Sequence, residues 1–256
     1  MRNKLTDELA VCGLNTIRTL SEVHPENINR LFLREDRLPL FTGLCKRLAE
    51  RKRPYKLCEN EELEKICKTP HHQGIVAMIF EPVIKGAMPE DIEEWAAKRK
   101  TGLLLCDIGN DLNLGAIVRS AAFFDASPIV ITGQESTEEE EPQLSTGAYR
   151  SAEGGMEYVE FLSVHSPASF LRSASKTLVT IGTDPRARIR IRDIPQIIKE
   201  QKKQGIVLVI GNEEKGLPPD VKEQCSFLAR IPGTGVIESL NAAQAATLFL
   251  QELYER

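Results

Sequence analysis

The chain has 256 residues, of which 41% are hydrophobic, and its formal net charge at pH 7 is −4. A hydrophobic fraction of this size supports a packed core and excludes a wholly disordered chain. No apolar run approaches the roughly 20 residues that cross a bilayer, and the first residues form no apolar leader. We therefore expect a cytoplasmic protein with no membrane partner.

The charge is distributed unevenly along the chain. Residues 1–85 carry a net positive charge and residues 86–256 a net negative one. The basic runs of the first part include Arg51 and Arg53, and they fit either RNA phosphate contacts or a solvated helix face. The six cysteines include no C-x-x-C pair. We therefore predict neither a disulfide framework nor a metal site.

The first predicted elements, within residues 3–80, alternate between helices and strands. Periodic apolar residues predict three helices, at residues 16–23, 38–51 and 61–67. Apolar runs predict three strands, at residues 29–34, 54–57 and 74–80. This alternation indicates a small α/β domain with a parallel or mixed sheet. Proline and glycine breaks in residues 82–99 then predict a linker with one short charged helix.

A second α/β series occupies the rest of the chain. Apolar runs predict six strands, at residues 102–108, 128–132, 156–161, 178–182, 205–211 and 227–231. Apolar-faced helices are predicted at residues 113–124 and 241–253, and an acidic run at residues 138–141 indicates an exposed loop. We expect a parallel sheet with helices on both faces and a ligand site beyond the carboxyl ends of its strands.

Three segments of this second series combine a buried strand, a turn rich in glycine or asparagine, and a helix start. They contain N-L-G-A-I-V-R at 113–119, G-N-E-E-K-G-L at 211–217 and I-P-G-T-G-V-I-E-S-L-N at 231–241. Glycines in such turns let the backbone approach a ligand, and helix N-termini attract anions. The dinucleotide fingerprint and the Walker sequence are both absent, which argues against NAD enzymes and P-loop ATPases.

Together, the three segments resemble the motifs of the SpoU/TrmH group of SPOUT-class RNA methyltransferases, and the likeness covers residues 101–256. Residues 10–80 resemble the ribosomal-protein-L30e-like substrate-binding domain of part of this family. The landmarks of that likeness are Gly13-Leu14-Asn15 and His72-Gln73-Gly74.

The resemblance implies an α/β protein of two domains. An RNA substrate-binding domain would occupy residues 1–81, a linker residues 82–99, and a SPOUT methyltransferase domain residues 100–256. The second domain would be a parallel-sheet fold with a deep trefoil knot, a feature that periodicity alone cannot reveal. The resemblance also implies a homodimer that forms through the knot region, with an active site that includes residues of both subunits.

The resemblance implies S-adenosylmethionine as the methyl donor, bound in the knot between the second and third motif loops. Six residues of these loops would bind it, namely Gly211, Asn212, Ile231, Thr234, Gly235 and Leu240. The implied reaction is methylation of a ribose 2′-hydroxyl, on which Arg119 would act. An arginine is a poor base because its pKa exceeds about 12, so a role in orienting phosphate and hydroxyl is equally consistent.

The helix prediction puts Arg119 one and a half turns after Asn113, near the carboxyl end of the preceding strand. Four polar residues would hold Arg119 and the ribose, namely Asn113, Glu213, Ser239 and Asn241. The carboxylate of Glu213 suits a cationic sulfonium donor. Ser239 also fits the N-cap of the last helix, and the two roles are compatible.

Two departures from the family motifs bear on packing and on the substrate. Residues 242–244 read A-A-Q where the family has V-S-x, behind the donor loop. Glu153 occupies a position at which family members have a small or hydroxyl residue. It could form an ion pair with Arg150 or alter the position in which RNA binds. Arg150 itself is a candidate RNA contact.

Two further candidate RNA contacts, Arg186 and Arg188, lie in a segment where arginines alternate with small or apolar residues up to Arg192. An extended segment would put four arginines on one face, for RNA phosphates or for a salt-bridged edge.

The sequence therefore favours a ribose 2′-O-methyltransferase whose partner is ribosomal or transfer RNA, with ribosomal RNA favoured because of the N-terminal domain. The alternative is a catalytically inactive RNA-binding relative. Uptake of S-adenosylmethionine would discriminate between the two, since a pure binding protein has no need of the donor.

Overall fold

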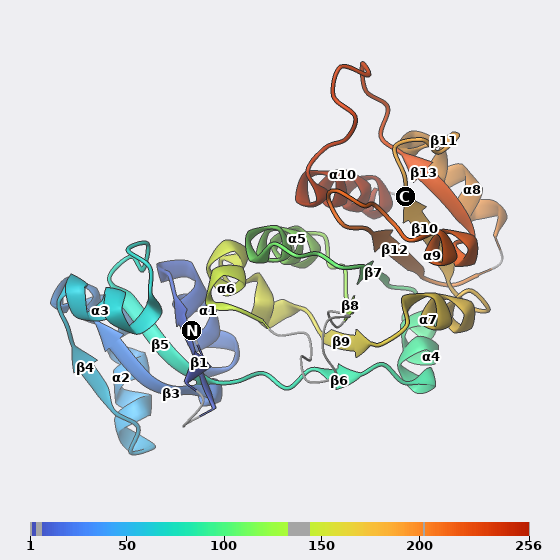
Figure 1. Ribbon diagram of the computed structural model, residues 1–256. Helices are drawn as coiled ribbons and strands as arrows, with labels where there is room; N and C mark the ends of the chain where they lie inside the picture. Colours follow the sequence, from blue (N-terminus) through green and yellow to red (C-terminus); the bar gives the residue numbers. More distant parts are fainter. Residues whose placement is uncertain (1, 4–6, 133–143, 202, 256) are drawn as a thin grey trace. The chain divides into compact units, whose positions relative to one another are not determined.

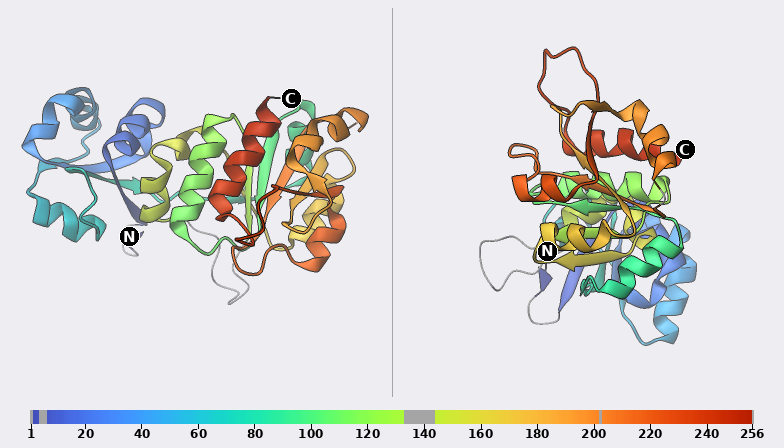
Figure 2. Two further views of the ribbon diagram at one scale, coloured as in Figure 1. Left: turned by 90° about the horizontal axis from the view of Figure 1, so that it is seen from above. Right: turned by 90° about the vertical axis from the view of Figure 1, so that its right-hand side faces the viewer.

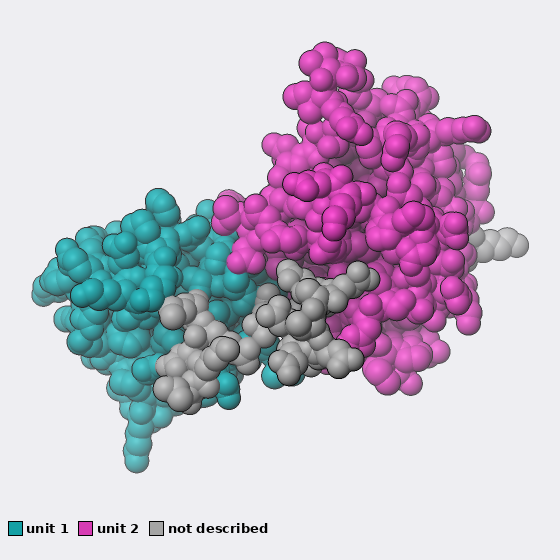
Figure 3. Space-filling view, in the orientation of Figure 1, with its two compact units in different colours: residues 1–83, 144–158 teal, residues 84–143, 159–256 magenta. Residues whose placement is uncertain are grey.

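The computed structural model describes residues 2–3, 7–132, 144–201 and 203–255. It divides into two compact units (Figure 3): unit 1 is Met1–Val83 with Leu144–Tyr158, and unit 2 is Ile84–Gln143 with Val159–Arg256. The chain therefore passes three times from one unit to the other. The predicted acidic loop at residues 138–141 lies outside the described residues.

Unit 1 contains a five-stranded mixed sheet in the order β1-β2-β5-β3-β4. Its strands are β1 (Arg2–Asn3), β2 (Glu8–Cys12), β3 (Ile28–Leu33), β4 (Tyr55–Leu57) and β5 (Ile75–Phe80). β5 pairs antiparallel with both β2 and β3, whereas β3 and β4 are parallel. The sequence prediction missed β2, whose five residues are all buried because the strand lies inside the sheet.

The three helices in the N-terminal part of unit 1 confirm the helices predicted from the apolar periodicity. They are α1 (Leu14–Val23), α2 (Leu38–Glu50) and α3 (Asn60–Cys67). Each has a buried apolar stripe at helical spacing, such as Ile17 and Leu20 on α1 and Leu44 and Leu48 on α2. These stripes pack on the sheet, whose buried strand residues complete the core of this unit.

Residues 144–158 fold with unit 1 although they come from the middle of the second α/β series. They form α6 (Thr146–Ala152) and a 3₁₀ helix, η3 (Gly155–Tyr158). The hydroxyl of Thr146 donates to the carbonyl of Ala10 at 2.6 Å, and that of Thr16 donates to the carbonyl of Tyr149 at 3.2 Å. The strand predicted at residues 156–161 is therefore wrong, because its first part is helical and packed in unit 1.

Unit 2 contains an eight-stranded sheet in the order β11-β13-β10-β12-β7-β8-β9-β6, and all of its described pairings are parallel. Its strands are β6 (Lys85–Gly86), β7 (Thr101–Leu105), β8 (Ile129–Thr132), β9 (Phe161–Val164), β10 (Val179–Thr183), β11 (Ile189–Arg190), β12 (Ile206–Ile210) and β13 (Phe227–Arg230). The predicted parallel sheet is confirmed.

Helices cover both faces of this sheet, as Figures 1 and 2 show. They are α4 (Pro89–Ala97), α5 (Asp111–Phe123), α7 (Pro167–Ala174), α8 (Ile194–Glu200), α9 (Pro219–Gln224) and α10 (Ala242–Tyr254). α4, α7 and α9 pack on one face of the central strands. The core that they form with it includes Trp95, Leu104, Phe170 and Val207. α10 packs against both α5 and α8 on the opposite face. The predicted trefoil knot stays a prediction.

Within the described residues, no helix is both long enough and apolar enough to span a bilayer.

Candidate active site

Loops that follow four neighbouring strands meet at one edge of the unit 2 sheet. The strands β13, β10, β12 and β7 are adjacent in that order, and all run in the same direction. Their carboxyl ends therefore lie side by side, which is where open α/β sheets bind ligands. The loops at residues 106–110, 211–218 and 231–241 follow β7, β12 and β13. The second and third family-like motifs lie in these loops, and the first begins at Asn113, in the first turn of the helix that follows β7.

A cavity of about 230 Å³ lies between the loops that follow β10, β12 and β13. Four predicted donor-binding residues line it: Gly211, Asn212, Ile231 and Leu240. Its wall also includes apolar residues of low exposure, namely Leu217, Ala242 and Phe249. Four acidic residues line it as well, namely Asp184, Glu213, Glu214 and Glu238. Four basic residues line it too, namely Arg186, Lys215, Lys222 and Arg230. An apolar wall beside side chains of both charges fits a ligand that joins an aromatic base to cationic and anionic groups, such as S-adenosylmethionine.

Thr234 and Gly235 were predicted to bind the donor, but neither is among the residues that line the cavity. Both are exposed on the loop between β13 and α10, which reaches away from the rest of unit 2 in Figure 1. Gly235 has a positive φ of 83° and turns this loop. The structure thus divides the third motif into a part that lines the cavity and a part that reaches outward.

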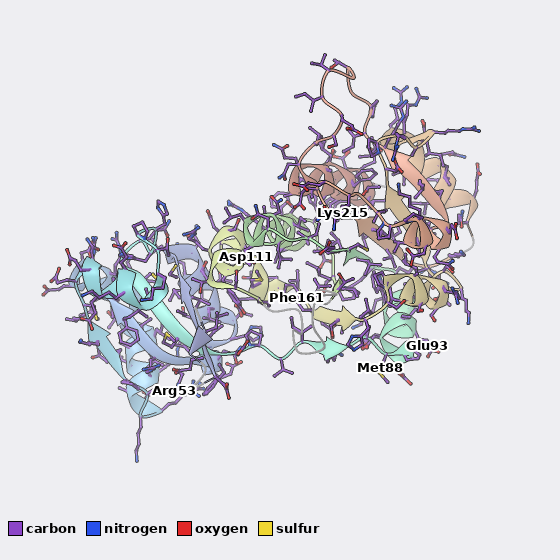
Figure 4. All side chains as sticks on the ribbon, viewed as in Figure 1. Arg53, Met88, Glu93, Asp111, Phe161 and Lys215 are labelled. Atoms are coloured by element: carbon purple, nitrogen blue, oxygen red, sulfur yellow. The ribbon has the colours of Figure 1, made fainter. Side chains whose placement is uncertain are left out.

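The turn after β12 needs glycine and asparagine for packing reasons. A Cβ on Gly211 would lie 2.5 Å from the carbonyl carbon of Gly216, so no side chain fits there. Asn212 Oδ1 accepts from the amides of Glu214 and Lys215 at 2.9 and 3.0 Å. Its Nδ2 donates to the carbonyl of Asp107 at 2.9 Å, which joins this turn to the loop after β7. Lys215 of the same turn is labelled in Figure 4.

Three predicted catalytic residues form one hydrogen-bonded set. Asn113 Nδ2 donates to Glu213 Oε1, and Asn241 Nδ2 donates to Asn113 Oδ1 at 2.9 Å. Asn241 Oδ1 also accepts from the amide of Ala243 at 2.9 Å and caps α10. Ser239 lines the cavity but is not the cap of this helix, so that part of the prediction is corrected.

Arg119 lies in the middle of α5, with an exposed side chain. It is one and a half turns beyond Asn113, as predicted, but eight residues after Asp111, the first residue of the helix. At 1.5 Å per residue it is roughly 12 Å along the helix, farther from the strand end than expected. Arg119 is not among the residues that line the cavity.

The arginine-rich segment after β10 is not an extended strand. Asp184 accepts at its carbonyl from the amide of Ala187 at 3.0 Å, which forms a turn, and only Ile189–Arg190 is a strand. The condition under which its four arginines would share one face is therefore not met. Arg186 still lines the cavity with a side chain that is 82% exposed, and Arg188 is exposed.

The candidate RNA-binding arginines of unit 1 differ in their surroundings. Arg51 is exposed at the end of α2. Arg53, labelled in Figure 4, donates to the carbonyl of Ile28 at 2.5 Å, and its guanidinium lies 5.3 Å from the centroid of the Phe80 ring. These contacts give Arg53 a structural role in the fold of unit 1. Arg150 donates to the hydroxyl of Thr69 at 2.7 Å.

Glu153, the residue that departs from the family pattern, ends α6 with a left-handed backbone. Its Oε2 accepts from Asn15 Nδ2 at 3.2 Å. Asn15 belongs to one of the landmarks of the N-terminal domain, and Gln73 of the other landmark accepts from the amide of Leu14 at 2.6 Å. The departure at Glu153 is thus accommodated inside unit 1.

The sequence prediction missed Asp184, which directly follows β10 and lines the cavity while only 8% exposed. Lys222 Nζ donates to its Oδ2 at 2.6 Å, and the amide of Arg186 donates to its Oδ1 at 2.8 Å. Burial by itself would raise the pKa of Asp184, but these hydrogen bonds outweigh it and hold the pKa below the ordinary value. Its place at the carboxyl end of a predicted parallel strand could have identified it.

Comparison with known proteins agrees with this geometry. Residues 100–251 match the SpoU rRNA Methylase family. Residues 10–83 match the family described as RNA 2′-O ribose methyltransferase substrate binding.

Curated relatives cover most of the chain. The 23S rRNA (guanosine-2′-O-)-methyltransferase RlmB of Acinetobacter baylyi is 29% identical over 251 residues, which is 94% of this chain and 94% of that protein. The putative TrmH family tRNA/rRNA methyltransferase YacO of Bacillus subtilis is 30% identical over 192 residues, or 73% of this chain and 72% of that protein.

Solved structures share the fold. The SpoU methyltransferase AviRb of Streptomyces viridochromogenes, in complex with AdoMet, superposes with a TM-score of 0.72 at 24% identity, over 97% of this chain and 90% of that one. An AdoMet-bound rRNA methyltransferase of Sinorhizobium meliloti gives a TM-score of 0.76 at 22% identity, over 98% of this chain and 88% of that one. The chain therefore belongs to the SpoU rRNA Methylase family and is an RNA methyltransferase.

Proposed function

We propose that the protein methylates a ribose 2′-hydroxyl of structured RNA, with ribosomal RNA favoured over transfer RNA. The observation that carries this proposal is the hydrogen-bonded set of Asn113, Glu213 and Asn241, in which Glu213 also lines the donor cavity. Each of the three motifs contributes one residue to it. The RlmB proteins of two bacteria, which are named for guanosine 2′-O-methylation of 23S rRNA, support the ribosomal preference.

S-adenosylmethionine supplies an electrophilic methyl group, so the protein has to hold the donor, orient the ribose and assist loss of the hydroxyl proton. The backbones of Gly211, Ile231 and Leu240 would hold the donor in the cavity that they line. The amide and carboxylate groups of the polar set, with the hydroxyl of Ser239, would orient the ribose. Arg119 would bind an RNA phosphate and polarise the 2′-hydroxyl.

The enzyme would act as a homodimer that forms through the predicted knot region. Three apolar side chains of unit 2 are strongly exposed: Phe123 by 80%, Val236 by 87% and Ile237 by 78%. Val236 and Ile237 lie on the outward part of the third motif loop, where a second copy would cover them. Arg119 lies outside the cavity lining, and this fits an active site completed by a second copy.

Residues 1–81 would select the RNA and residues 100–256 would methylate. Residues 82–99, predicted as a linker, contain β6 and α4, which pack in unit 2, so they would belong to the methylating part. The packing of residues 144–158 in unit 1 adds Arg150 to the RNA-selecting part. With Arg51 it would contact phosphates on that unit, whereas Arg186 and Arg188 would do so beside the donor cavity.

Methyl transfer from labelled donor to total RNA, followed by nuclease mapping, tests this function. We expect label in a 2′-O-methyl nucleotide of ribosomal RNA, and we expect Arg119→Ala to abolish it. Arg172→Ala is the matched control, because Arg172 is an exposed arginine on α7, a helix on the opposite face of the sheet.

Label on a base, or full activity of Arg119→Ala, would contradict the proposed reaction, and label confined to transfer RNA would contradict the preference. A protein that binds RNA but takes up no S-adenosylmethionine in a calorimeter would instead be the inactive RNA-binding relative.

A further inference from the structure

The carboxylate of Asp184 belongs to none of the three motifs, yet it lines the donor cavity. It directly follows β10, which lies between β13 and β12 in the sheet. Asp184 therefore stands between the two loops that carry the predicted donor contacts. Its own amide donates to the carbonyl of Ala229 at 3.0 Å, which ties it to the end of β13.

The side chain of Asp184 is held in place from two sides. Lys222, on α9, donates to Oδ2, and the backbone amide of Arg186 donates to Oδ1. Arg186 Nε lies 3.8 Å from Oδ1. A carboxylate has about four acceptor positions on its two oxygens, so these two hydrogen bonds leave acceptor capacity for a ligand in the cavity.

The donor offers two kinds of group to a carboxylate: a cationic sulfonium with an amino-acid tail, and the vicinal hydroxyls of a ribose. The ammonium of Lys222 already compensates the charge of Asp184, which weakens its attraction for a further cation. The compensated carboxylate still accepts hydrogen bonds. A ribose diol presents two adjacent O–H donors, and an acidic residue past a parallel strand is suited to accept them.

The arrangement of the sheet agrees with this choice. The reacting end of the donor has to lie beside Asn113 and Glu213, which follow β7 and β12. Asp184 follows β10, which lies on the other side of β12 from β7. β10 is therefore two strand spacings from β7, or roughly 10 Å. The nucleoside end of the donor is therefore the part within its reach.

We propose that Asp184 accepts hydrogen bonds from the ribose hydroxyls of the donor's own adenosine, and that Lys222 positions it for this contact. Asp184 is thus a specificity-determining residue for the nucleoside of the methyl donor. The proposal rests on the donor cavity and is independent of which RNA atom receives the methyl group.

Calorimetric binding of S-adenosylhomocysteine and of its 2′-deoxy and 3′-deoxy analogues tests this assignment. We expect the wild-type protein to bind at least one deoxy analogue about tenfold or more weakly than the parent, because a hydrogen bond to a charged group is lost. In Asp184→Asn we expect weaker binding of the parent and a much smaller difference between parent and analogue. The matched control is Asp220→Asn, at an exposed acidic residue of α9 outside the cavity lining, which should keep the wild-type ratio.

Equal affinity of the wild type for all three ligands would overturn the proposal without recourse to any variant. So would an Asp184→Asn protein that loses affinity for all three by the same factor, since a purely structural role has that result. Lys222→Met keeps the Asp184 carboxylate but removes the ammonium that positions it. This variant should retain part of the discrimination between the parent ligand and its deoxy analogues, and a folded variant that does so would show that the carboxylate itself makes the contact. A protein that shows the expected ratios but methylates a base would contradict only the function proposed above.

Discussion

Asn113 is the residue on which the polar site depends, because its side-chain amide donates to one motif and accepts from another. Its Nδ2 bonds Glu213 and its Oδ1 accepts from Asn241. An amide makes both bonds at once, whereas an ionised carboxylate of the same shape only accepts. The residue types at these three positions therefore depend on each other.

We expect Asn241→Asp to lower methyl transfer about tenfold or more while the thermal midpoint hardly changes. The aspartate keeps the oxygen that caps α10. It loses the N–H group that donates to Asn113 Oδ1, so a carboxylate oxygen and an amide oxygen, both acceptors, then face each other. Asn241→Ala loses both contacts, so its unfolding free energy should also fall by about 1 kcal/mol. Methyl-transfer rates and thermal unfolding measure the two effects. Wild-type activity in Asn241→Asp would show that the bond to Asn113 is dispensable.

At the scale of elements, α6 and η3 are joined by a glycine that packs closely against α1. Gly154 connects the two helices with a φ of 96°, and a Cβ there would lie 2.4 Å from Thr19 Oγ1 and 2.8 Å from Thr19 Cβ. Next to it, His24 Nδ1 lies 2.8 Å from Glu157 Oε2. Burial raises the pKa of Glu157, and the contact with His24 opposes that shift.

We expect Gly154→Ala to loosen this segment, with a loss of about 2 kcal/mol or more from strain at positive φ and from the clash with Thr19. Hydrogen exchange should rise in residues 144–158, and urea unfolding should begin at lower concentration. Gly43→Ala is the matched control, because Gly43 lies in α2 with nothing within 4 Å of an added Cβ. Ala should be neutral or stabilising there. Unchanged exchange in Gly154→Ala would contradict the tight packing of this turn.

At the scale of the whole molecule, the two units divide the proposed work. The donor cavity and the polar set lie entirely in unit 2, and the landmarks of the substrate-binding family lie in unit 1. Residues 144–158 leave the methyltransferase series and fold with unit 1. A truncation that removes residues 1–83 would therefore also strip α6 of its partners and is a poor test of either unit.

We expect the exposed loop of the third motif to form the homodimer interface, so Ile237→Asp should shift the protein from dimer to monomer in analytical ultracentrifugation. The charge would be buried against the second copy without a partner. Methyl transfer should fall with the dimer, whereas donor binding should persist. The control is Val83→Asp, at a valine that is 93% exposed in unit 1. A wild-type protein that sediments as a monomer would exclude this interface.

The sequence by itself determined the α/β class, most helices and strands, and the three motifs, because these depend on local periodicity and turn chemistry. It missed β2, whose short run gives a weak signal. It also assigned residues 156–158 to a strand, although they are helical and pack in unit 1. It left open whether the segment Arg186–Arg192 is extended, and the structure shows that the backbone turns after Asp184.

Only the tertiary structure decided which side chains meet. Asn113 and Glu213 are 100 residues apart, and the adjacency of β7 and β12 in the sheet brings them into contact. Asp184 became a candidate because β10 lies between β12 and β13 in the sheet, although it precedes both in the chain. Strand order is set by how the whole core packs, and no local pattern encodes it.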